Sequence, residues 1–287
     1  MHPRGWPGRR KRDWSGGEAS WALALLALLL APLSIHAQVT SDDIEFRKKE
    51  YVDKAGVRLP YRLFVPLGYD TKRKYPLLLW LHGGEGRGSD NVRQISGGNQ
   101  MATHFFISDD LQLKFPMFVL VPQCPSGGTW ADPDLNQPTK WLELTMAALG
   151  VIEKEFSVDA RRLYVAGQSM GGLGTWATLQ AYPGKWAGAM ILCAYDNFTE
   201  IQALAQTPIW VFQGEADDTV PVPLVREMMK QLRKAHANLR YTEYPKTGHE
   251  VWKKAFAEPE LIPWLSSQKL AEAVEGQVGS GAGAPKQ

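Results

Sequence analysis

The sequence has little cysteine, little net charge and no apolar stretch long enough to cross a membrane. Its 287 residues include two cysteines and six histidines, with a formal net charge of +2. Residues 1–37 hold five of the basic and two of the acidic side chains, so the remainder carries 27 basic and 28 acidic residues. This balance gives no basic surface for nucleic acid. No histidine pair has the spacing of a metal site, so no metal or organic cofactor is expected.

The first 37 residues differ from the rest of the chain. Residues 9–12 are all basic, and the apolar run 21–33 follows them. A basic segment followed by a short apolar one is typical of a secretory signal peptide. A membrane anchor is the alternative, but the run falls short of the ~20 residues that a spanning helix needs. We therefore expect a signal peptide over 1–37, a secreted or periplasmic protein, and no membrane contact in the mature form.

Short apolar runs in the middle of the chain predict buried strands. They are YPLLLWLHGG, FPMFVLVPQ, RRLYVAGQS, WAGAMILCA and TPIWVFQGE, and each ends in or soon runs into glycine, proline or polar residues. Nearly continuous apolar character suits strands covered on both faces, and such strands are usually parallel. Before them, IEFRKKEYV and RLPYRLFVP alternate apolar and polar residues around DKAG, which predicts a hairpin. LRYTEYP supplies a last strand.

Segments with helical periodicity lie between these runs. Residues 141–156 and 222–237 place their apolar side chains largely on one side of a helix. Alternating strands and helices predict an α/β domain, with a mostly parallel central sheet and helices on both faces. We assign this single domain to residues 38–274. The tail 275–287 has too little apolar content to pack and is expected to be disordered.

The stretch GQSMGG places Ser169 between glycines, where an apolar run meets a helical segment. A strand, a sharp turn and a helix are the context in which G-x-S-x-G marks a nucleophile. The serine must adopt a strained backbone, and Gly167 and Gly171 have no Cβ to clash with the neighbouring strand and helix. Its Oγ then lies at a helix N-terminus, which favours developing negative charge. An inert serine in a glycine-flanked turn is the alternative.

A serine hydroxyl needs a base, and the order of elements favours His249. His249 lies in YPKTGHEVW directly after the last predicted strand, whereas His104 precedes the serine in a poorly patterned stretch. His82 precedes the glycines of HGGEG and is expected to shape that loop.

The carboxylate that orients the base is expected at the end of a strand between the serine and the histidine. WVFQGEADDTVPV offers Glu215, Asp217 and Asp218 in that window. We favour Asp217, which lies on the turn three residues past Gly214, where the imidazole that it holds would stabilise its buried charge. Asp218 is the alternative, and its other role would be to cap the following helix.

Acyl transfer also needs backbone donors aimed at the oxyanion of the tetrahedral intermediate. The amide of Met170 comes with the turn around the serine. The second donor is expected in the glycine-rich loop after LLLWLHGG, at Gly84 or, as the alternative, at Glu85. An ordinary turn is the competing interpretation of this loop, because GGEGRG lacks the Gly-Lys-Ser/Thr ending of a phosphate-binding loop.

The segments HGG, GQSMGG, GEADDTVP and GHEVW, each after a predicted strand, resemble those of the α/β-hydrolase superfamily over about residues 45–264. The chain is most similar to secreted bacterial esterases related to the phospholipase/carboxylesterase, dienelactone hydrolase and polyhydroxybutyrate depolymerase groups, often grouped as predicted peptidases. The resemblance implies an α/β-hydrolase fold with a triad of Ser169, Asp217 and His249 and oxyanion amides at Gly84 and Met170. It also implies a substrate-binding aromatic residue brought to the site rim by VPQCPSGGTW, here Trp130, for which core packing is the alternative.

The same resemblance bears on two further features, the order of the strands and the presence of a lid. Two strands would separate the one ending at Cys124 from the one ending at Cys193. Three inter-strand steps come to about 14 Å, beyond the ~7 Å limit between bridged Cα atoms, so two free cysteines are expected. Many relatives carry a lid after the sixth strand, but CAYDNFTEIQALAQTP leaves room for one short helix. We therefore expect no large lid domain and an open pocket.

These features predict a secreted serine carboxylic ester hydrolase that forms an acyl-enzyme on a small-molecule or polymer-linked ester. A serine peptidase of the prolyl oligopeptidase type is one alternative, although such enzymes usually carry a large additional domain for which this chain has no room. A non-catalytic binding protein with a hydrolase fold is another, although it would usually lack one triad residue.

Overall fold

An eight-stranded sheet organises the part of the chain that the structure describes. The computed structural model describes residues 46–132, 134, 137–196 and 201–272, all within one of two units, Val39–Gln287. The predicted signal peptide and the predicted disordered tail lie outside these residues.

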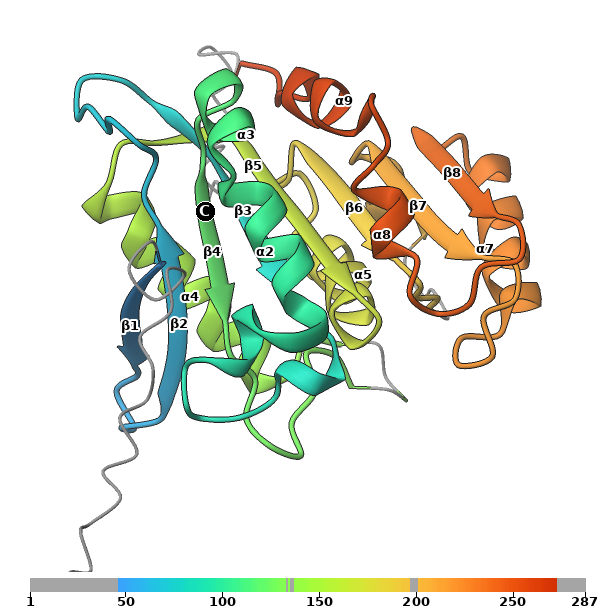
Figure 1. Cartoon of the computed structure of the whole chain (residues 1–287), viewed down its shortest axis with the longest axis horizontal. Helices are drawn as coiled ribbons and strands as arrows, with labels where there is room; N and C mark the ends of the chain where they lie inside the picture. The colour runs from blue at the N-terminus through green and yellow to red at the C-terminus, as the bar shows by residue number, and fades with distance from the viewer. Residues whose placement is uncertain (1–45, 133, 135–136, 197–200, 273–287) are drawn as a thin grey trace, which may run out of the picture. The chain divides into compact units, whose positions relative to one another are not determined.

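The sheet is mostly parallel and has the order β1-β2-β4-β3-β5-β6-β7-β8 (Figure 1). β1 and β2 form the predicted antiparallel hairpin, β2 also pairs antiparallel with β4, and every other neighbouring pair is parallel. The strands cover all the runs in which the sequence predicts them, and the predicted α/β fold is confirmed. Their bounds are β1 Phe46–Val52, β2 Arg58–Phe64, β3 Tyr75–Leu81, β4 Phe118–Pro122, β5 Val158–Gln168, β6 Gly188–Leu192, β7 Ile209–Gly214 and β8 Leu239–Tyr244.

Helices cover both faces of the sheet because alternate side chains of the buried strands point to opposite sides. On β3, Leu77 and Leu79 join one buried cluster, whereas Leu78 and Trp80 join the other. Helices α4 to α7 contribute to the first cluster; α2, α3, α8 and α9 contribute to the second and lie in front of the sheet in Figure 1. The bounds are α2 Gln100–Ile107, α3 Asp109–Lys114, α4 Lys140–Glu155, α5 Met170–Ala181, α6 Ile201–Ala205, α7 Val222–Lys234, α8 Trp252–Ala255 and α9 Leu261–Ser267, with 3-10 turns η1 Gly84–Gly86, η2 Arg93–Ile95 and η3 Gly97–Asn99.

The helix predicted over 222–237 ends earlier, at Lys234. His236 has a φ of 57° and donates its amide to the carbonyl of Arg233, and the amide of Ala237 reaches back to Leu232. This pattern is a Schellman C-cap with a histidine where glycine is usual. The prediction extended the helix to residue 237 because the apolar periodicity continues beyond Lys234, although the helical backbone hydrogen bonds end there.

The connections between strands agree with the expected topology. β3 and β5 separate β4 from β6, and both Cys124 and Cys193 are buried free thiols, as expected. The described part of the connection between β6 and β7 contains the short helix α6, with no room for a large lid domain. Within the ranges given above, no helix has both the length and the apolar content for a membrane span.

Parallel strands bring their C-terminal ends to one edge of the sheet. The loops that follow β3, β5, β7 and β8 therefore meet there, at the kind of edge where ligands bind in open α/β sheets. Each of the four loops carries one part of the predicted site.

Candidate active site

The turn between β5 and α5 holds Ser169 in a strained conformation. Ser169 has φ 52° and ψ −118°, outside the regions that residues with a side chain favour. Its amide donates to the carbonyl of Leu192 on β6. A Cβ on Gly171 would lie 1.9 Å from the carbonyl oxygen of Leu81, and one on Gly167 would lie 2.3 Å from that of Gly171. Both glycines are therefore required by close backbone contacts, for the reason expected from the sequence.

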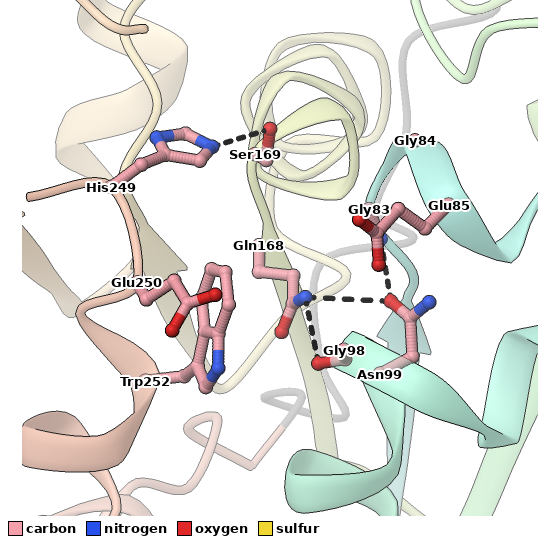
Figure 2. A pocket seen from close by; sticks show the side chains of 10 residues that line it. All are labelled: Gly83, Gly84, Glu85, Gly98, Asn99, Gln168, Ser169, His249, Glu250 and Trp252. Atoms are coloured by element: carbon pink, nitrogen blue, oxygen red, sulfur yellow. Dashed lines mark hydrogen bonds between the residues drawn. The ribbon is translucent and has the colours of Figure 1, made fainter. Parts of the chain in front are cut away.

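A chain of hydrogen bonds joins the three residues predicted as a triad. His249 Nε2 lies 2.9 Å from Ser169 Oγ, and His249 Nδ1 lies 2.9 Å from Asp217 Oδ2 and 3.1 Å from Oδ1 (Figure 2 draws the bond to the serine). The serine follows β5, the aspartate follows β7 and the histidine follows β8. These distances allow proton transfer between the hydroxyl and the imidazole. His104, the histidine that the sequence disfavoured, lies on α2 beside Gln100.

The carboxylate of Asp217 is buried and well solvated by protein donors. Burial opposes its ionisation, but the amides of Val220 and Thr219, at 2.9 Å each, and the ring of His249 outweigh it and lower the pKa of Asp217. The side chain is fully buried and remains a carboxylate that orients the imidazole and stabilises its protonated form. Asp218 is exposed, and no side-chain hydrogen bond caps α7, whose N-cap is Pro221.

Gln213 is a contact of the site that the sequence reasoning missed. Its Nε2 donates to Asp217 Oδ2 at 2.8 Å, the same oxygen that faces His249 Nδ1 at 2.9 Å. The one sequence feature that could have indicated this role is the position of Gln213, an amide side chain at the end of the otherwise apolar run of β7. Gly214 follows it, and a Cβ there would lie 2.3 Å from the carbonyl oxygen of Thr247. The aspartate and histidine loops can approach this closely because the strand ends in glycine.

The predicted oxyanion donors are the first amides of two helical segments. Met170 begins α5 and Gly84 begins η1, so neither amide has an acceptor within its own helix. The amide of Gly83 donates to Asn99 Oδ1 at 2.9 Å, and Gly84 is among the residues that line the pocket. No pattern in the sequence pointed to Asn99, because its partner is 16 positions away.

His82 holds this loop against the loop after β4, as the sequence suggested. The amide of Cys124 donates to His82 Nε2 at 3.0 Å, so Nδ1 carries the proton and donates to the carbonyl of Gly83 at 2.7 Å. The ring is completely buried, and this burial lowers its pKa to about 4. The neutral imidazole therefore acts as a structural link beneath the predicted oxyanion loop.

Trp130 does not lie at the rim of the site, which corrects the substrate-binding expectation. It is fully buried, its Nε1 donates to the carbonyl of His82 at 3.1 Å, and a Cβ on Gly174 of α5 would lie 2.4 Å from Trp130 Cβ. The loop after β4 folds inward because the indole fills the space that this glycine leaves. The core-packing alternative describes its position.

An open pocket of about 260 Å³ lies in front of the serine (Figure 2). Trp252, rather than Trp130, is its aromatic wall, and its ring meets that of His249 edge to face at 6.2 Å between centroids. The lining residues are Gly83, Gly84, Glu85, Gly98, Asn99, Gln168, Ser169, His249, Glu250 and Trp252. In the described part of the chain, no group of three His, Cys, Asp or Glu side chains is placed to hold a metal ion.

The strand order, the strained serine at the end of β5 and the loops around it define an α/β-hydrolase. A family model described as "Putative esterase" matches residues 54–263, and the chain belongs to this family. The description of this family refers to ester hydrolysis.

The chain is also similar to individual proteins that are named as esterases. The chain is 30% identical over 159 residues to the bifunctional acetylxylan esterase/xylanase XynS20E of Neocallimastix patriciarum, covering 55% of this chain and 22% of that protein. It is 33% identical to a thermostable esterase of known crystal structure, with a TM-score of 0.75 over 79% of this chain and 64% of the other. It therefore spans less than two thirds of the length of either relative. A ferulic acid esterase from Anaeromyces mucronatus, 16% identical, shares the fold with a TM-score of 0.56 over 78% of this chain and 90% of the other.

Proposed function

We propose that the protein hydrolyses carboxylic esters through an acyl-enzyme on Ser169, and the observation that carries this proposal is the Ser169–His249–Asp217 hydrogen-bond chain. His249 Nε2 accepts the hydroxyl proton as Oγ attacks the ester carbonyl. The amides of Gly84 and Met170 donate to the resulting oxyanion. The imidazolium then protonates the departing alcohol, and the ester bond to that alcohol breaks. Water, deprotonated by the same imidazole, releases the acid and restores the serine.

The substrate proposed is a small-molecule or polymer-linked ester. The named relatives act on acetylxylan and ferulic acid esters, which supports an acyl group carried on a sugar polymer. An open pocket beside the serine, with no large lid in the described part of the chain, is compatible with an ester attached to a larger molecule.

A fluorophosphonate probe tests the acyl-enzyme directly, because it labels only an activated serine. We expect the wild type to be labelled at Ser169 and to hydrolyse p-nitrophenyl acetate, and we expect Ser169→Ala and His249→Gln to lose both. His104→Gln is the matched control, since that histidine lies on α2 outside the pocket and its variant should keep both. An unlabelled wild type, or equal labelling of wild type and Ser169→Ala, refutes the proposal.

We also propose that residues 1–37 direct export and are removed. The support is the basic segment followed by the short apolar run. N-terminal sequencing of the protein from the producing cell's periplasm or medium is expected to begin at Gln38. Recovery of the intact chain from inside the cell contradicts export.

A further inference from the structure

The pocket in front of Ser169 is lined by more negative charge than the reaction needs. Glu85, on the loop after β3, and Glu250, on the loop after β8, both line it, and no lysine or arginine is among its described lining residues. Figure 2 shows the two side chains on opposite walls, with both carboxylates extending toward the space between them. The oxyanion mechanism uses neither carboxylate.

Neither carboxylate is neutralised by a buried partner. Glu250 pairs with Lys253 at 3.4 Å, but both side chains are more than 60% exposed, and such pairs contribute little. Glu85 lies against Gly98, where a Cβ would come within 2.9 Å of Glu85 Oε2, and no ion pair engages it among the residues described. Arg87, in the same loop, donates instead to the carbonyl of Gly128. The two walls therefore present net negative charge to a bound molecule.

The floor of the pocket adds a neutral amide. Gln168 Nε2 faces the carbonyl of Gly98 at 3.3 Å and Asn99 Oδ1 at 3.4 Å, and these contacts fix the orientation of the amide. Its carbonyl oxygen, Oε1, is buried with no hydrogen-bond partner in the described residues, and the whole residue is only 4% exposed. Because this oxygen is buried, a ligand in the pocket does not reach it, and the neutral amide leaves the sign of the pocket's charge to the two carboxylates. Figure 2 shows the Gln168 side chain between the two walls, with its Nε2 bonded to Gly98 and Asn99.

These groups together describe the ligand that fits them. A primary ammonium carries a positive charge and N–H donors, which complement the two exposed carboxylates. The indole of Trp252 on the same wall also attracts cations through its π face. A carboxylate in the same place meets like charges and no lining cation.

We infer that the pocket selects esters carrying an ammonium group near the ester bond over esters carrying a carboxylate there, and that Glu85 and Glu250 are specificity-determining residues. This inference rests on the proposed ester hydrolysis. The group belongs to the acyl or to the alcohol portion of the substrate, and the chemistry that recognises it is the same in both cases.

Esters matched in length and differing only in charge test the inference. On the acyl side these are methyl 6-aminohexanoate, methyl heptanoate and monomethyl pimelate, which end in an ammonium, a methyl and a carboxylate. On the alcohol side, 6-aminohexyl butyrate is compared with heptyl butyrate, which has the same length and no charge. Hydrolysis is followed in a pH-stat, and each kcat/KM is divided by that of the neutral ester. One carboxylate a few ångströms from a unit charge changes binding by a few-fold. The two carboxylates together are therefore expected to raise kcat/KM for the cationic ester about tenfold over that for the neutral ester, in either the acyl or the alcohol series. If the preference appears in the acyl series, the kcat/KM of monomethyl pimelate is expected to be about tenfold below that of methyl heptanoate.

Charge-removing variants identify the source of the preference. Glu85→Gln and Glu250→Gln are each expected to reduce the cation-to-neutral ratio by a few-fold, and the double variant to bring it near one. Glu227→Gln is the matched control, because Glu227 on α7 pairs with Lys230 in the same i,i+3 geometry and distance, away from the pocket lining. That control should leave the ratio unchanged.

Each outcome separates this inference from the proposed function. A wild type that hydrolyses methyl heptanoate with no charge preference on either side overturns the inference and leaves the ester hydrolase intact. A preference that persists in the double variant also overturns it. A wild type that hydrolyses none of these esters and resists fluorophosphonate refutes the proposed function, and this inference with it. If the double variant does not fold, the two single variants decide by the same ratio.

Discussion

Mild acid should destabilise this protein through one buried side chain, His82. The ring is completely buried, its Nε2 accepts from the amide of Cys124 and its Nδ1 donates to the carbonyl of Gly83. A proton added to Nε2 breaks the first of these bonds and places a charge in an apolar environment. Burial therefore lowers the pKa of His82 from 6.5 in the unfolded chain to about 4 in the native state.

The sign and size of the effect follow from this difference. Between pH 6.5 and pH 4 the unfolded chain binds a proton at His82 and the native state does not, so the free energy of unfolding falls as the pH falls. The stability that the neutral, buried His82 contributes is fully present above pH 6.5 and fully lost below about pH 4. One pKa unit corresponds to about 1.4 kcal/mol, so the total loss is about 3 kcal/mol. Asp217 titrates in a different window, because its lowered pKa places its loss below the ordinary carboxyl range.

Urea unfolding at several pH values between 7 and 4 measures this loss. The comparison variant is His82→Gln, whose amide can accept from Cys124 but does not titrate. It is expected to be less stable than the wild type at pH 7, and its stability should change about 3 kcal/mol less between pH 7 and pH 4. Equal pH dependence in the two proteins would show that His82 is not the group responsible and would refute the reasoning.

Three further predictions concern the support of the site. Gln213→Leu removes a donor from the buried carboxylate of Asp217 and should lower kcat/KM for p-nitrophenyl acetate about 10- to 100-fold. The control Gln180→Leu removes a similar amide–carboxylate bond, to Asp196, and should leave kcat/KM within twofold. Equal effects of the two substitutions would contradict the role of Gln213. Gly171→Ala should lower the free energy of unfolding by more than about 4 kcal/mol or prevent folding, because its Cβ meets a backbone carbonyl oxygen at 1.9 Å. Gly150→Ala on α4 places its Cβ in open space, so urea unfolding should show a neutral or stabilising effect. Cys124 and Cys193 should not react with Ellman's reagent until urea unfolds the chain, because both are buried and burial raises the pKa of the Cys124 thiol to about 12; a thiol that titrates in the folded protein would contradict their placement.

The sequence predicted best those features that depend on short-range patterns. Short continuous apolar runs bounded by turn residues favour buried strands, and every predicted strand is present. Ser169 was recognisable because the strained turn needs glycines at fixed offsets, and those offsets are visible in the chain. The choice of Asp217 and His249 came from the order of elements, since loops after parallel strands meet at one edge.

Features that depend on contacts between distant residues were not predictable in the same way. Trp130 lies in a loop whose sequence suits a rim and a core equally, and the space left by Gly174 decides that it is buried. Asn99 and Gln213 are ordinary polar residues until folding places them beside Gly83 and Asp217. The early end of α7 depends on a positive φ at His236, a residue that seldom takes the role of glycine.

By itself, the sequence determined the layered α/β fold, the sharp turn at Ser169 and the loops from which its partners come, because hydrophobic periodicity and glycine geometry act over a few residues. Only the tertiary structure decided which side chains face the pocket and what charge they bring to it. Glu85 and Glu250 are 165 positions apart, and nothing local to either indicates that they line opposite walls of one site. The reason is that electrostatic and packing interactions depend on distance in space, which the chain order sets only after the sheet has formed.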